Sequence, residues 1–469
     1  MSHTFPPLSG AELEQTLGRI VGAERVHMDA DSLQQYGLDR TRQYTPAPCA
    51  IVFPEQTTQV RELVLLARRH RLAIVPSGGR TGLSGGAVAA QGELVIALER
   101  MNRILDFNAV DRSLHCEAGM ITAQLQAFAQ QQNLFYPVDF ASSGSSQIGG
   151  NVATNAGGIK VIRYGLTRDQ ILGLTVVTGQ GDILQLNRGL VKNATGYDLR
   201  HLFIGSEGTL GLITEVTVRL MTPPENPTVM VLGITDMSAL MQVLEQFRQR
   251  IEPTAFEFFS EPALQHVIRR GLARPFAQPA PFYALLEFES RHESIQAAAL
   301  AVFEYCLARG WVLDGVMSQN GRQAAELWRL REDISETIAA YMPYKNDLSV
   351  RVSRVPEFLA AVDQVVAERY AGFEVIWYGH IGDGNLHLNI LKPAQWTPEA
   401  FFRQCEQVNK DVFAIVRRLE GSISAEHGVG LLKRDYLDYS RSPEELACLR
   451  AIKQLFDPDH IMNPGKLLA

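Results

Sequence analysis

Three glycine-rich segments lie within residues 45–220, and they constrain the fold of this half of the chain most strongly. They are SGGRTGLSGG (77–86), QIGGNVATNAGGIK (147–160) and FIGSEGTLGLITEVTVRL (203–220). A glycine loop that follows a strand lets backbone N–H groups approach phosphate oxygens closely. Three ordinary tight turns are the competing interpretation. Because one loop also carries Arg80 and Thr81 as donors, we favour a nucleotide-type ligand.

The segments between these loops predict a mixed α/β region. TTQVRELVLLARRH (57–70) has the spacing of an amphipathic helix, and LAIVP (72–76) follows as a short buried strand. GQGDILQL (179–186) is typical of a hairpin turn that leads into a strand, and residues 203–220 end in an alternating strand.

Neither common nucleotide-binding fingerprint is present. The G-x-G pairs that begin at Gly179, Gly382 and Gly428 have leucine, histidine and lysine where the third glycine would stand. No G-x-x-x-x-G-K-[ST] occurs either. The residues alone therefore indicate a phosphate-bearing cofactor held outside the dinucleotide-binding Rossmann and P-loop classes.

A domain boundary is predicted at TPPENP (222–227), because adjacent prolines interrupt both helix and strand. Beyond it, strand-like and helix-like segments alternate with short connections, which predicts a sheet covered by helices on one face. The predicted strands are 228–234, 255–259, 283–289 and 312–317, and the predicted helices are 237–250, 292–310 and 400–420.

Two short turn-like segments concentrate histidines. GHIGDGNLHLNI (379–390) predicts a strand–turn–strand unit that folds His380 back toward His387, and SAEHG (424–428) adds Glu426 and His427. Two imidazoles, a carboxylate and an open position suit a catalytic divalent metal, usually zinc. The competing interpretation is a set of separately hydrogen-bonded polar residues. The spacing is not H-E-x-x-H, so a peptidase is not supported.

A cluster of cations precedes this unit. NGRQAAELWRLREDISETIAAYM (320–342) predicts a helix with Trp328, Arg331 and Ser335 on one face. The strand after it places four side chains on one face: Lys345, Asp347, Ser349 and Arg351. A solvated charged surface is the competing interpretation, and we adopt it for Arg329 and Arg351.

Composition excludes several classes of protein. The 469 residues carry a net charge of -7, which disfavours nucleic acid and anionic membranes as partners. The five cysteines are scattered without a C-x-x-C pair, so a disulfide framework is not expected. The N-terminus lacks the apolar core of a signal peptide, and no run reaches the length of a membrane span. We expect a soluble cytoplasmic protein.

Four ordered motifs resemble the FAD-binding domain of the vanillyl-alcohol-oxidase superfamily: 76–86, 148–158, 196–214 and the terminal NPGK (463–466). The resemblance implies a bound FAD. Members with covalent flavin usually carry a histidine in the first loop; GGRTG stands here, so noncovalent FAD is expected. The resemblance assigns these cofactor-binding residues: Pro76, Gly78, Gly79, Arg80, Thr81, Gly82, Ser145, Ser146, Gly149, Asn151, Thr154, Glu207, Gly208, Ile213 and Asn463.

One branch of this superfamily also matches the histidine segments. GHIGDGNLH and SAEHGVG resemble the metal motifs of the D-2-hydroxy acid dehydrogenases. By that resemblance His380, His387 and Glu426 are metal ligands. His427 is the general base, and Asn389 is a pocket residue.

Within this branch, LWRLREDISE and YKNDLS most resemble the D-2-hydroxyglutarate dehydrogenases. The resemblance assigns Arg331, Ser335 and Lys345 to substrate binding. The family more often has threonine where Ser335 stands, and serine keeps the hydroxyl. Two cations in one pocket suit a dicarboxylate, because arginine grips a carboxylate bidentately.

The resemblance thus implies an α+β protein with a two-part α/β FAD-binding domain (1–222), a substrate or cap domain with an antiparallel sheet covered by helices and the metal site (223–430), and a C-terminal segment returning to the FAD site (431–469). The expected reaction is oxidation of a D-2-hydroxy acid, with electrons passed to an electron-transfer flavoprotein or a quinone-linked carrier. A homodimer is one assembly this allows. D-lactate or glycolate as substrate, a non-redox flavin-dependent transferase and a noncatalytic nucleotide-binding module are the alternatives.

Overall fold

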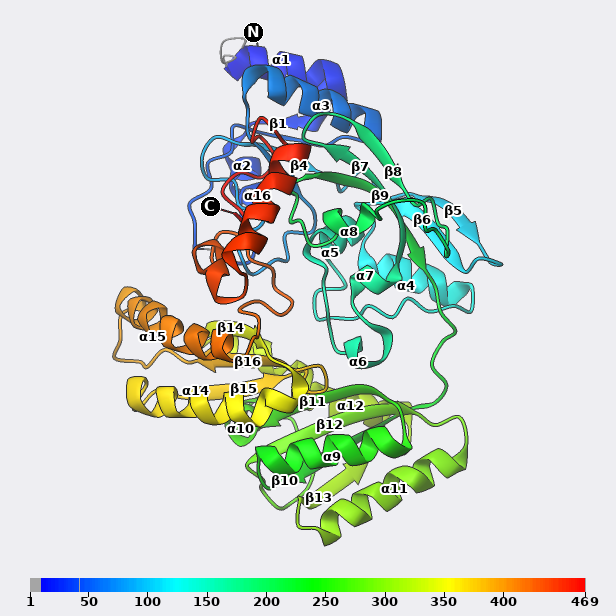
Figure 1. Cartoon of the computed structure of the whole chain (residues 1–469), viewed down its shortest axis with the longest axis vertical. Helices are drawn as coiled ribbons and strands as arrows, with labels where there is room; N and C mark the ends of the chain where they lie inside the picture. The colour runs from blue at the N-terminus through cyan, green and yellow to red at the C-terminus, as the bar shows by residue number, and fades with distance from the viewer. Residues whose placement is uncertain (1–9, 42, 469) are drawn as a thin grey trace. The chain divides into compact units, whose positions relative to one another are not determined.

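The computed structural model describes residues 10–41 and 43–468, and the chain divides into two compact units (Figure 1). The first contains residues up to Gly157, then Leu166–Pro223, and the chain from Glu426 onward. The second contains Gly158–Gly165 and Pro224–Ala425. No helix in the described part of the chain is both long and apolar enough to cross a membrane.

The first unit contains two sheets. A four-stranded sheet has the order β1-β2-β4-β3, with β2, β4 and β3 parallel. A five-stranded antiparallel sheet has the order β5-β6-β9-β7-β8. The strands are β1 (Val26–His27), β2 (Ala50–Val52), β3 (Ile74–Ser77), β4 (Leu94–Ala97), β5 (Ile104–Asn108), β6 (Ser113–Glu117), β7 (Ile171–Thr178), β8 (Ile183–Leu186) and β9 (Gly211–Arg219).

Helices of the first unit pack their apolar stripes into one core cluster that joins both sheets. The predicted helix over 57–70 is confirmed as α3, which buries Val60, Leu63, Val64 and Ala67. The predicted strand over 72–76 begins later, at Ile74, because the N–H of Leu72 still bonds the carbonyl of Ala67 in α3. The helical elements are α1 (Gly10–Val21), η1 (Ala23–Arg25), α2 (Ala30–Tyr36), α3 (Thr57–His70), α4 (Thr122–Gln131), α5 (Ile148–Thr154), α7 (Thr167–Gln170), α8 (Arg200–Phe203), η3 (Arg434–Tyr439) and α16 (Pro443–Phe456).

The second unit is built on one seven-stranded antiparallel sheet with the order β13-β10-β12-β11-β15-β16-β14. The four predicted strands and the predicted strand–turn–strand unit are confirmed, several with one or two more residues at an end. The strand predicted from Lys345 to Arg351 ends earlier, at Ser349, and Arg351 precedes η2. The strands of this sheet are β10 (Pro227–Ile234), β11 (Pro253–Ser260), β12 (Phe282–Glu289), β13 (Val312–Met317), β14 (Tyr344–Ser349), β15 (Val375–Gly379) and β16 (Asn385–Ile390).

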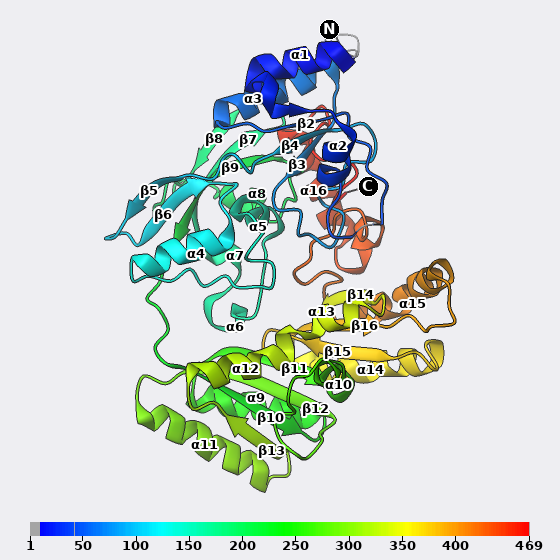
Figure 2. The same ribbon diagram turned by 180° about the vertical axis from the view of Figure 1, so that it is seen from behind.

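Helices cover both faces of this sheet, so the expected single covered face is wrong (Figures 1 and 2). Helices α10 (Glu261–Arg269), α12 (Gly321–Glu332) and α13 (Ile334–Ala339) pack with Val231, Phe259 and Leu285 on one face. On the other face, Phe303 approaches Leu232 and Gly315. The residues of β12 show why both faces are covered. They are buried on both sides of the sheet, as expected for a strand between two layers of helices. The remaining helical elements are α6 (Val161–Tyr164), α9 (Met237–Arg250), α11 (Glu293–Ala308), η2 (Val352–Arg354), α14 (Val355–Arg369) and α15 (Pro398–Arg418).

The single helix predicted over 320–342 is wrong in one respect, because the chain turns at Asp333 and forms α12 and α13 instead. The Asp333 carboxylate accepts hydrogen bonds from Arg329 of the preceding turn, and aspartate is a weak residue in a helix interior. Arg331 therefore lies at the end of α12, whereas Ser335 lies at the start of α13.

Candidate functional site

The pairing of β14 with β16 gathers polar side chains on one sheet face. Lys345 lies opposite Asn389, and Asp347 lies opposite His387. Opposed residues of an antiparallel pair share a face, and alternate residues along a strand do too. Asp347, His387 and Asn389 are all buried. Tyr378 of β15 also faces His387, with ring centroids 5.0 Å apart.

The turn between β15 and β16 explains the two histidines around it. His380 begins the turn and His387 lies in the returning strand, and their ring centroids are 5.4 Å apart. Gly384 closes the turn with φ +88°, and a Cβ there would lie 2.1 Å from the Val350 carbonyl oxygen. Only glycine fits this position without displacing the backbone.

A buried glutamate of β11 contacts both this turn and α12. Glu257 Oε1 lies 2.8 Å from His380 Nδ1, and Arg331 Nη2 lies 2.9 Å from Glu257 Oε2. The second contact is an ion pair, because its angles do not meet those of a hydrogen bond. The Arg331 guanidinium also lies 4.6 Å from the Tyr378 ring centroid. Because Nδ1 of His380 is engaged, Nε2 is the ring atom through which His380 would bind a metal.

Glu426 and His427 follow a segment that is hydrogen bonded to β14. Ser422 and Ser349 exchange two backbone hydrogen bonds, and the Ala425 N–H reaches the Asp347 carbonyl oxygen at 3.4 Å. In the first unit, Ser84 Oγ donates to the His427 carbonyl oxygen at 2.9 Å.

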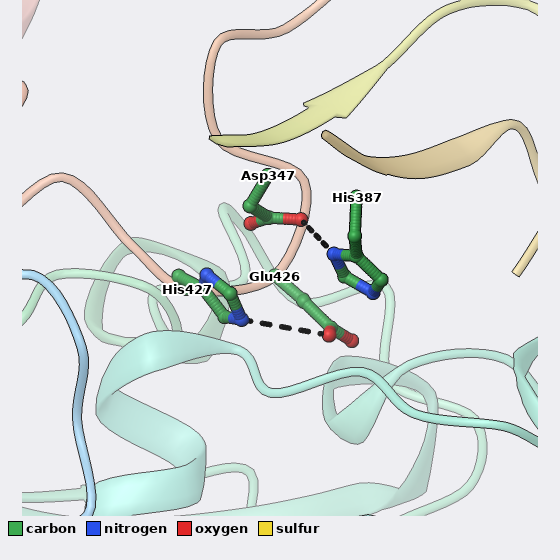
Figure 3. A group of neighbouring side chains, drawn as sticks. All are labelled: Asp347, His387, Glu426 and His427. Atoms are coloured by element: carbon green, nitrogen blue, oxygen red, sulfur yellow. Dashed lines mark ion pairs between the residues drawn. The ribbon is translucent and has the colours of Figure 1, made fainter. Parts of the chain in front are cut away.

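Four side chains form a potential metal-binding group (Figure 3). Asp347, His387, Glu426 and His427 each offer one ligand atom, and these atoms lie within 4.8 Å of one another. His387 Nδ1 is 3.6 Å from Asp347 Oδ1, and His427 Nε2 is 3.8 Å from Glu426 Oε1. Imidazole nitrogens with carboxylate oxygens are a donor set that zinc accepts. The residues present therefore fit a divalent metal.

Asp347 and Glu257 received no functional role from the sequence. Both are 1% exposed. One signal for Asp347 was visible, because strand alternation already placed it on the face of Lys345. A signal for Glu257 was a lone carboxylate in the apolar strand AFEFF, since a charge at such a place is buried and must be paired.

The predicted anion pocket is assembled from three elements of the second unit. Lys345 Nζ donates to Ser335 Oγ at 3.0 Å, which links β14 to α13. Arg331 Nε and Asn389 Oδ1 are buried and have no hydrogen-bond partner among the described residues. Buried polar atoms of this kind need a partner, so the pocket fits a ligand that is both charged and hydrogen bonding.

Arg329 and Arg351 do not belong to this pocket. Arg329 is more than half exposed and pairs with Asp333. Arg351 is also mostly exposed and pairs with Glu420. Their interpretation as a solvated charged surface is confirmed.

In the first unit, the first two glycine-rich loops touch each other. A Cβ at Gly79 would lie 2.2 Å from the Ser145 carbonyl oxygen, and one at Gly149 would lie 2.6 Å from the Ala118 side chain. Arg80 takes a positive φ of 55°, and its guanidinium lies over the Tyr36 ring at 4.0 Å. The Gly79 contact brings the backbone of the first loop against the residues that lead into the second loop.

A polar network supports the second loop. Asn151 Nδ2 donates to Thr122 Oγ1 at 2.7 Å, and the Thr122 and Ser146 hydroxyls lie 2.8 Å apart. Thr154 Oγ1 bonds the Gly150 carbonyl at 3.1 Å. Three predicted cofactor residues, Ser146, Asn151 and Thr154, therefore stabilise the conformation of the second loop.

The third loop and the C-terminal segment are tied together. Glu207 accepts hydrogen bonds from the N–H groups of Val429 and Gly430 at 2.7 and 2.8 Å, and burial raises the pKa of its carboxyl group. Asn463 Nδ2 donates to the carbonyls of Gly86 and Glu207.

The other predicted cofactor residues lie on the same three loops or on the strands beside them. They are Pro76 in β3, Gly78, Thr81 and Gly82 in the first loop, Gly208 with φ +71°, and buried Ile213 in β9.

Buried acceptors near these loops fit a flavin nucleotide. Gln147 Oε1, 3.5 Å from a Cβ built on Gly78, and Asn463 Oδ1 have no hydrogen-bond partner among the described residues. FAD carries hydroxyl and imide N–H donors that such acceptors could bind.

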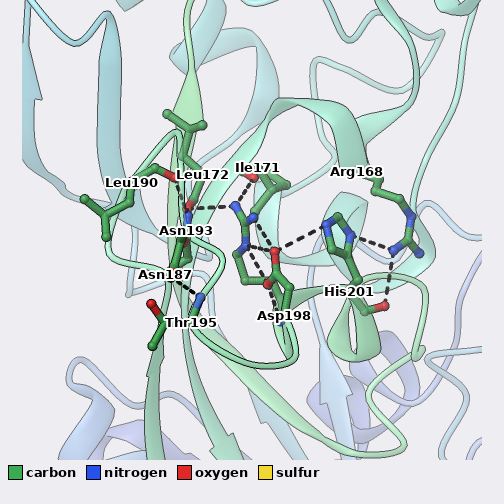
Figure 4. Close-up of polar contacts among 10 residues, drawn as sticks. Arg168, Ile171, Leu172, Asn187, Leu190, Asn193, Thr195, Asp198 and His201 are labelled. Atoms are coloured by element: carbon green, nitrogen blue, oxygen red, sulfur yellow. Dashed lines mark hydrogen bonds and ion pairs between the residues drawn. The ribbon is translucent and has the colours of Figure 1, made fainter.

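A separate basic group lies in the first unit around Arg168 and His201 (Figure 4), and Arg200 belongs to it. It borders a cavity of about 200 Å³. Arg200 donates to the Asp198 carboxylate and to the carbonyls of Ile171 and Leu172, while Arg168 donates to the carbonyls of His201 and Ile204. These guanidinium groups brace the loop, so we assign no anion site here.

The chain matches two sequence families. Residues 48–187 match the family described as the FAD binding domain, and residues 223–467 match the FAD linked oxidases, C-terminal domain. Among curated proteins, a D-2-hydroxyglutarate dehydrogenase of Stutzerimonas stutzeri is 58% identical over 97% of this chain and 98% of its own length. One of Xanthomonas citri pv. viticola is 53% identical over 96% of each. A mitochondrial D-2-hydroxyglutarate dehydrogenase of Arabidopsis thaliana is 36% identical over 96% of this chain and 80% of its own length.

Solved structures share the fold at low sequence identity. Alkyldihydroxyacetonephosphate synthase superposes with a TM-score of 0.74 at 20% identity, covering 98% of this chain and 87% of its own. p-Cresol methylhydroxylase superposes with a TM-score of 0.75 at 16% identity, covering 98% and 97%. These likenesses confirm the predicted vanillyl-alcohol-oxidase type of fold.

Proposed function

Because the chain belongs to the family of FAD-linked oxidases that includes the D-2-hydroxyglutarate dehydrogenases, we propose that it oxidises D-2-hydroxyglutarate to the 2-oxo acid. The observation that carries the proposal is one sheet face on which Lys345 and Asn389 lie beside Asp347 and His387. Such a face offers a cation for a carboxylate next to groups able to bind a metal. The substrate would lose a hydride from its α-carbon and a proton from its hydroxyl group.

Two bound groups complete this proposal. His387 and Glu426 of the four-residue group, together with His380, would hold a divalent metal, which we propose to be zinc. His380 lies outside that group, with its ring centroid 5.4 Å from that of His387, and Asp347 is a further carboxylate beside His387. The predicted loop residues would hold FAD noncovalently. When bound, FAD supplies the hydride acceptor, and the metal supplies a Lewis acid that lowers the pKa of the substrate hydroxyl.

His427 is proposed as the general base that takes the hydroxyl proton. Its backbone is held from two sides in the first unit. Ser84 Oγ donates to its carbonyl oxygen, and Glu207 accepts from the N–H groups of Val429 and Gly430, two and three residues further on. These bonds fix the backbone position from which the imidazole of His427 would reach the substrate hydroxyl.

Arg331 and Lys345 are proposed to bind the substrate carboxylates, with Ser335 and Asn389 as neutral hydrogen-bonding partners. Lys345 Nζ donates to Ser335 Oγ, so the hydroxyl hydrogen of Ser335 points elsewhere and can donate to a carboxylate. The two cations come from different elements, α12 and β14, and so match two separate carboxylates better than one. This favours a dicarboxylate over lactate or glycolate.

The remaining parts of the proposal rest on the sequence. Residues 1–222 would form the FAD-binding domain, 223–430 the substrate domain, and 431–469 the segment returning to the flavin. Reduced flavin would pass its electrons to an electron-transfer flavoprotein or a quinone-linked carrier. We place the protein in the cytoplasm, and a homodimer is one assembly consistent with the family.

An anaerobic experiment tests the proposal. The purified protein, with its metal content recorded, is mixed with D-2-hydroxyglutarate, D-lactate or glycolate while flavin absorbance is followed. We expect fast bleaching by D-2-hydroxyglutarate that a chelator abolishes and zinc restores. Bleaching by D-lactate or glycolate alone would keep the reaction type but identify a different substrate. No bleaching by any of the three acids, with flavin bound, would overturn the oxidation and favour the non-redox transferase.

A further inference from the structure

We propose that Glu257 is a positioning residue that couples the metal ligand His380 to the substrate-binding Arg331. Its two carboxylate oxygens face different partners, with Oε1 at 2.8 Å from His380 Nδ1 and Oε2 at 2.9 Å from Arg331 Nη2. The inference rests on the proposed function, because it assumes that His380 binds the metal and Arg331 binds the substrate.

The contact with His380 fixes the state of the imidazole. A carboxylate accepts hydrogen bonds but does not donate them, so the proton of neutral His380 must lie on Nδ1. The lone pair is then on Nε2, the form that a metal requires. The hydrogen bond also fixes the rotation of the ring, which lies directly after β15 at the start of the turn.

The contact with Arg331 holds the second partner of Glu257 in place. The Arg331 guanidinium contacts the Glu257 carboxylate and lies 4.6 Å from the Tyr378 ring centroid, and only 7% of the Arg331 side chain is exposed. A buried guanidinium without a counter-charge is strongly destabilised, so Glu257 supplies the negative charge that keeps Arg331 in the pocket. The ion pair leaves Nε of Arg331 without a hydrogen-bond partner among the described residues, and this group could bind a carboxylate.

The neighbouring strand supplies a matched control. Glu287 of β12 is a second buried carboxylate, and its pairing partner Ala255 places it on the same sheet face as Glu257. It accepts hydrogen bonds from Trp328 Nε1 at 3.0 Å and Thr254 Oγ1 at 2.5 Å, and it pairs with Lys160. None of these partners is a predicted metal ligand or substrate residue. Glu287→Gln therefore reproduces the loss of a buried charge without the proposed coupling.

The first test measures metal binding without turnover. Full-length wild-type, Glu257→Gln and Glu287→Gln proteins are stripped with a chelator, and Zn²⁺ affinity is measured by competition with a chromophoric chelator. The glutamine amide keeps one acceptor but cannot accept from both partners. We expect Zn²⁺ affinity to fall about 10- to 100-fold in Glu257→Gln and to stay at the wild-type value in Glu287→Gln. Equal Zn²⁺ affinity in the two variants would overturn the coupling.

The second test addresses Arg331. With Zn²⁺ at saturation, Glu257→Gln should still show a raised KM for D-2-hydroxyglutarate, because the guanidinium has lost its counter-charge. Restoration of the wild-type KM by Zn²⁺ alone would overturn the Arg331 half of the inference. If the wild-type protein itself binds no Zn²⁺, the metal site of the proposed function fails, and this inference fails with it.

A second variant, Glu257→Asp, keeps the proposal testable if Glu257→Gln does not fold. Should Glu257→Gln lose its circular dichroism or its flavin, Glu257→Asp keeps the negative charge but cannot reach both partners at the present distances. We expect Glu257→Asp to fold and to bind Zn²⁺ several-fold more weakly than the wild-type protein. Unchanged Zn²⁺ affinity in Glu257→Asp would overturn the proposal.

Discussion

The side chains of Lys345 and Ser335 are joined by a hydrogen bond of 3.0 Å between Nζ and Oγ. The bond links a strand at the sheet edge to the first turn of a helix on one face of that sheet. Two residues that the sequence assigned separately to one pocket are therefore in direct contact. The ammonium group keeps further donors that can be offered to a carboxylate.

Lys345→Met should discriminate between substrates. Removing one charge-assisted hydrogen bond should raise the KM for D-2-hydroxyglutarate on the order of 10- to 100-fold. D-lactate, which lacks the second carboxylate, should be affected much less. Steady-state kinetics with both acids check this. The matched control is Lys392→Met, because Lys392 donates to the carbonyls of Pro393 and Trp396, outside the predicted pocket. Equal losses for both acids would argue against a dicarboxylate pocket.

His427→Ala should retain FAD but lose substrate-driven reduction of the flavin. Loss of a general base lowers the rate by about 100-fold or more. Stopped-flow absorbance with D-2-hydroxyglutarate measures it, and the visible spectrum reports bound flavin. His292→Ala, a change at an exposed helix N-cap, serves as the control. Flavin reduction at the wild-type rate in His427→Ala would refute its role as the base.

Gly384→Ala should destabilise the second unit and weaken zinc binding. The substitution meets both a positive φ and the Val350 carbonyl oxygen at 2.1 Å. Gly372→Ala separates the two effects, since Gly372 has φ +82° but nothing within 4 Å of a Cβ. We expect about 1–2 kcal/mol of destabilisation in Gly372→Ala from φ alone, and more in Gly384→Ala. Urea unfolding measures the free energy of unfolding of both variants. A Gly384→Ala protein as stable as Gly372→Ala would show that the turn is looser than described.

One thiol per chain should react rapidly with iodoacetamide in the native protein at pH 8. Cys448 is exposed, whereas burial raises the thiol pKa of the other four, to about 11 or about 12. The thiolate is the reacting form, and a thiol with a raised pKa holds very little of it at pH 8. Mass spectrometry should show one modified cysteine in native protein, none in Cys448→Ser and five after denaturation. Rapid modification of Cys116 or Cys405 would contradict the described core.

Local patterns in the sequence predicted much of the fold and part of the site. The helix over 57–70, the strands of the second unit and the turn around Gly382 and Gly384 depend on periodicity and turn chemistry, which act over a few residues. The approach of His380 to His387 follows from that turn. The predicted single helix failed at Asp333, a weak helix former, where α12 ends and α13 begins.

The partners of the site could not be read from the sequence. Glu257 and His380 are 123 residues apart, and their contact depends on β11 pairing with β15. Alternation along a strand gives the face of a side chain but not the neighbouring strand. The two covered faces were missed for a related reason, although the continuous apolar run in YALLEFE indicates burial on both sides.

The hydrogen bonds of Asn463 have a consequence for how the protein is made. Its side chain joins the carbonyls of Gly86 and Glu207, which precede it by 377 and 256 residues. On the ribosome, the glycine-rich loops therefore emerge long before the residue that ties them, and Pro224–Ala425 of the second unit are synthesised in between. Domains generally fold as units during translation, and here the second unit can do so while the first waits for its final segment. Capture of the flavin in its finished site is thus a late step in biosynthesis.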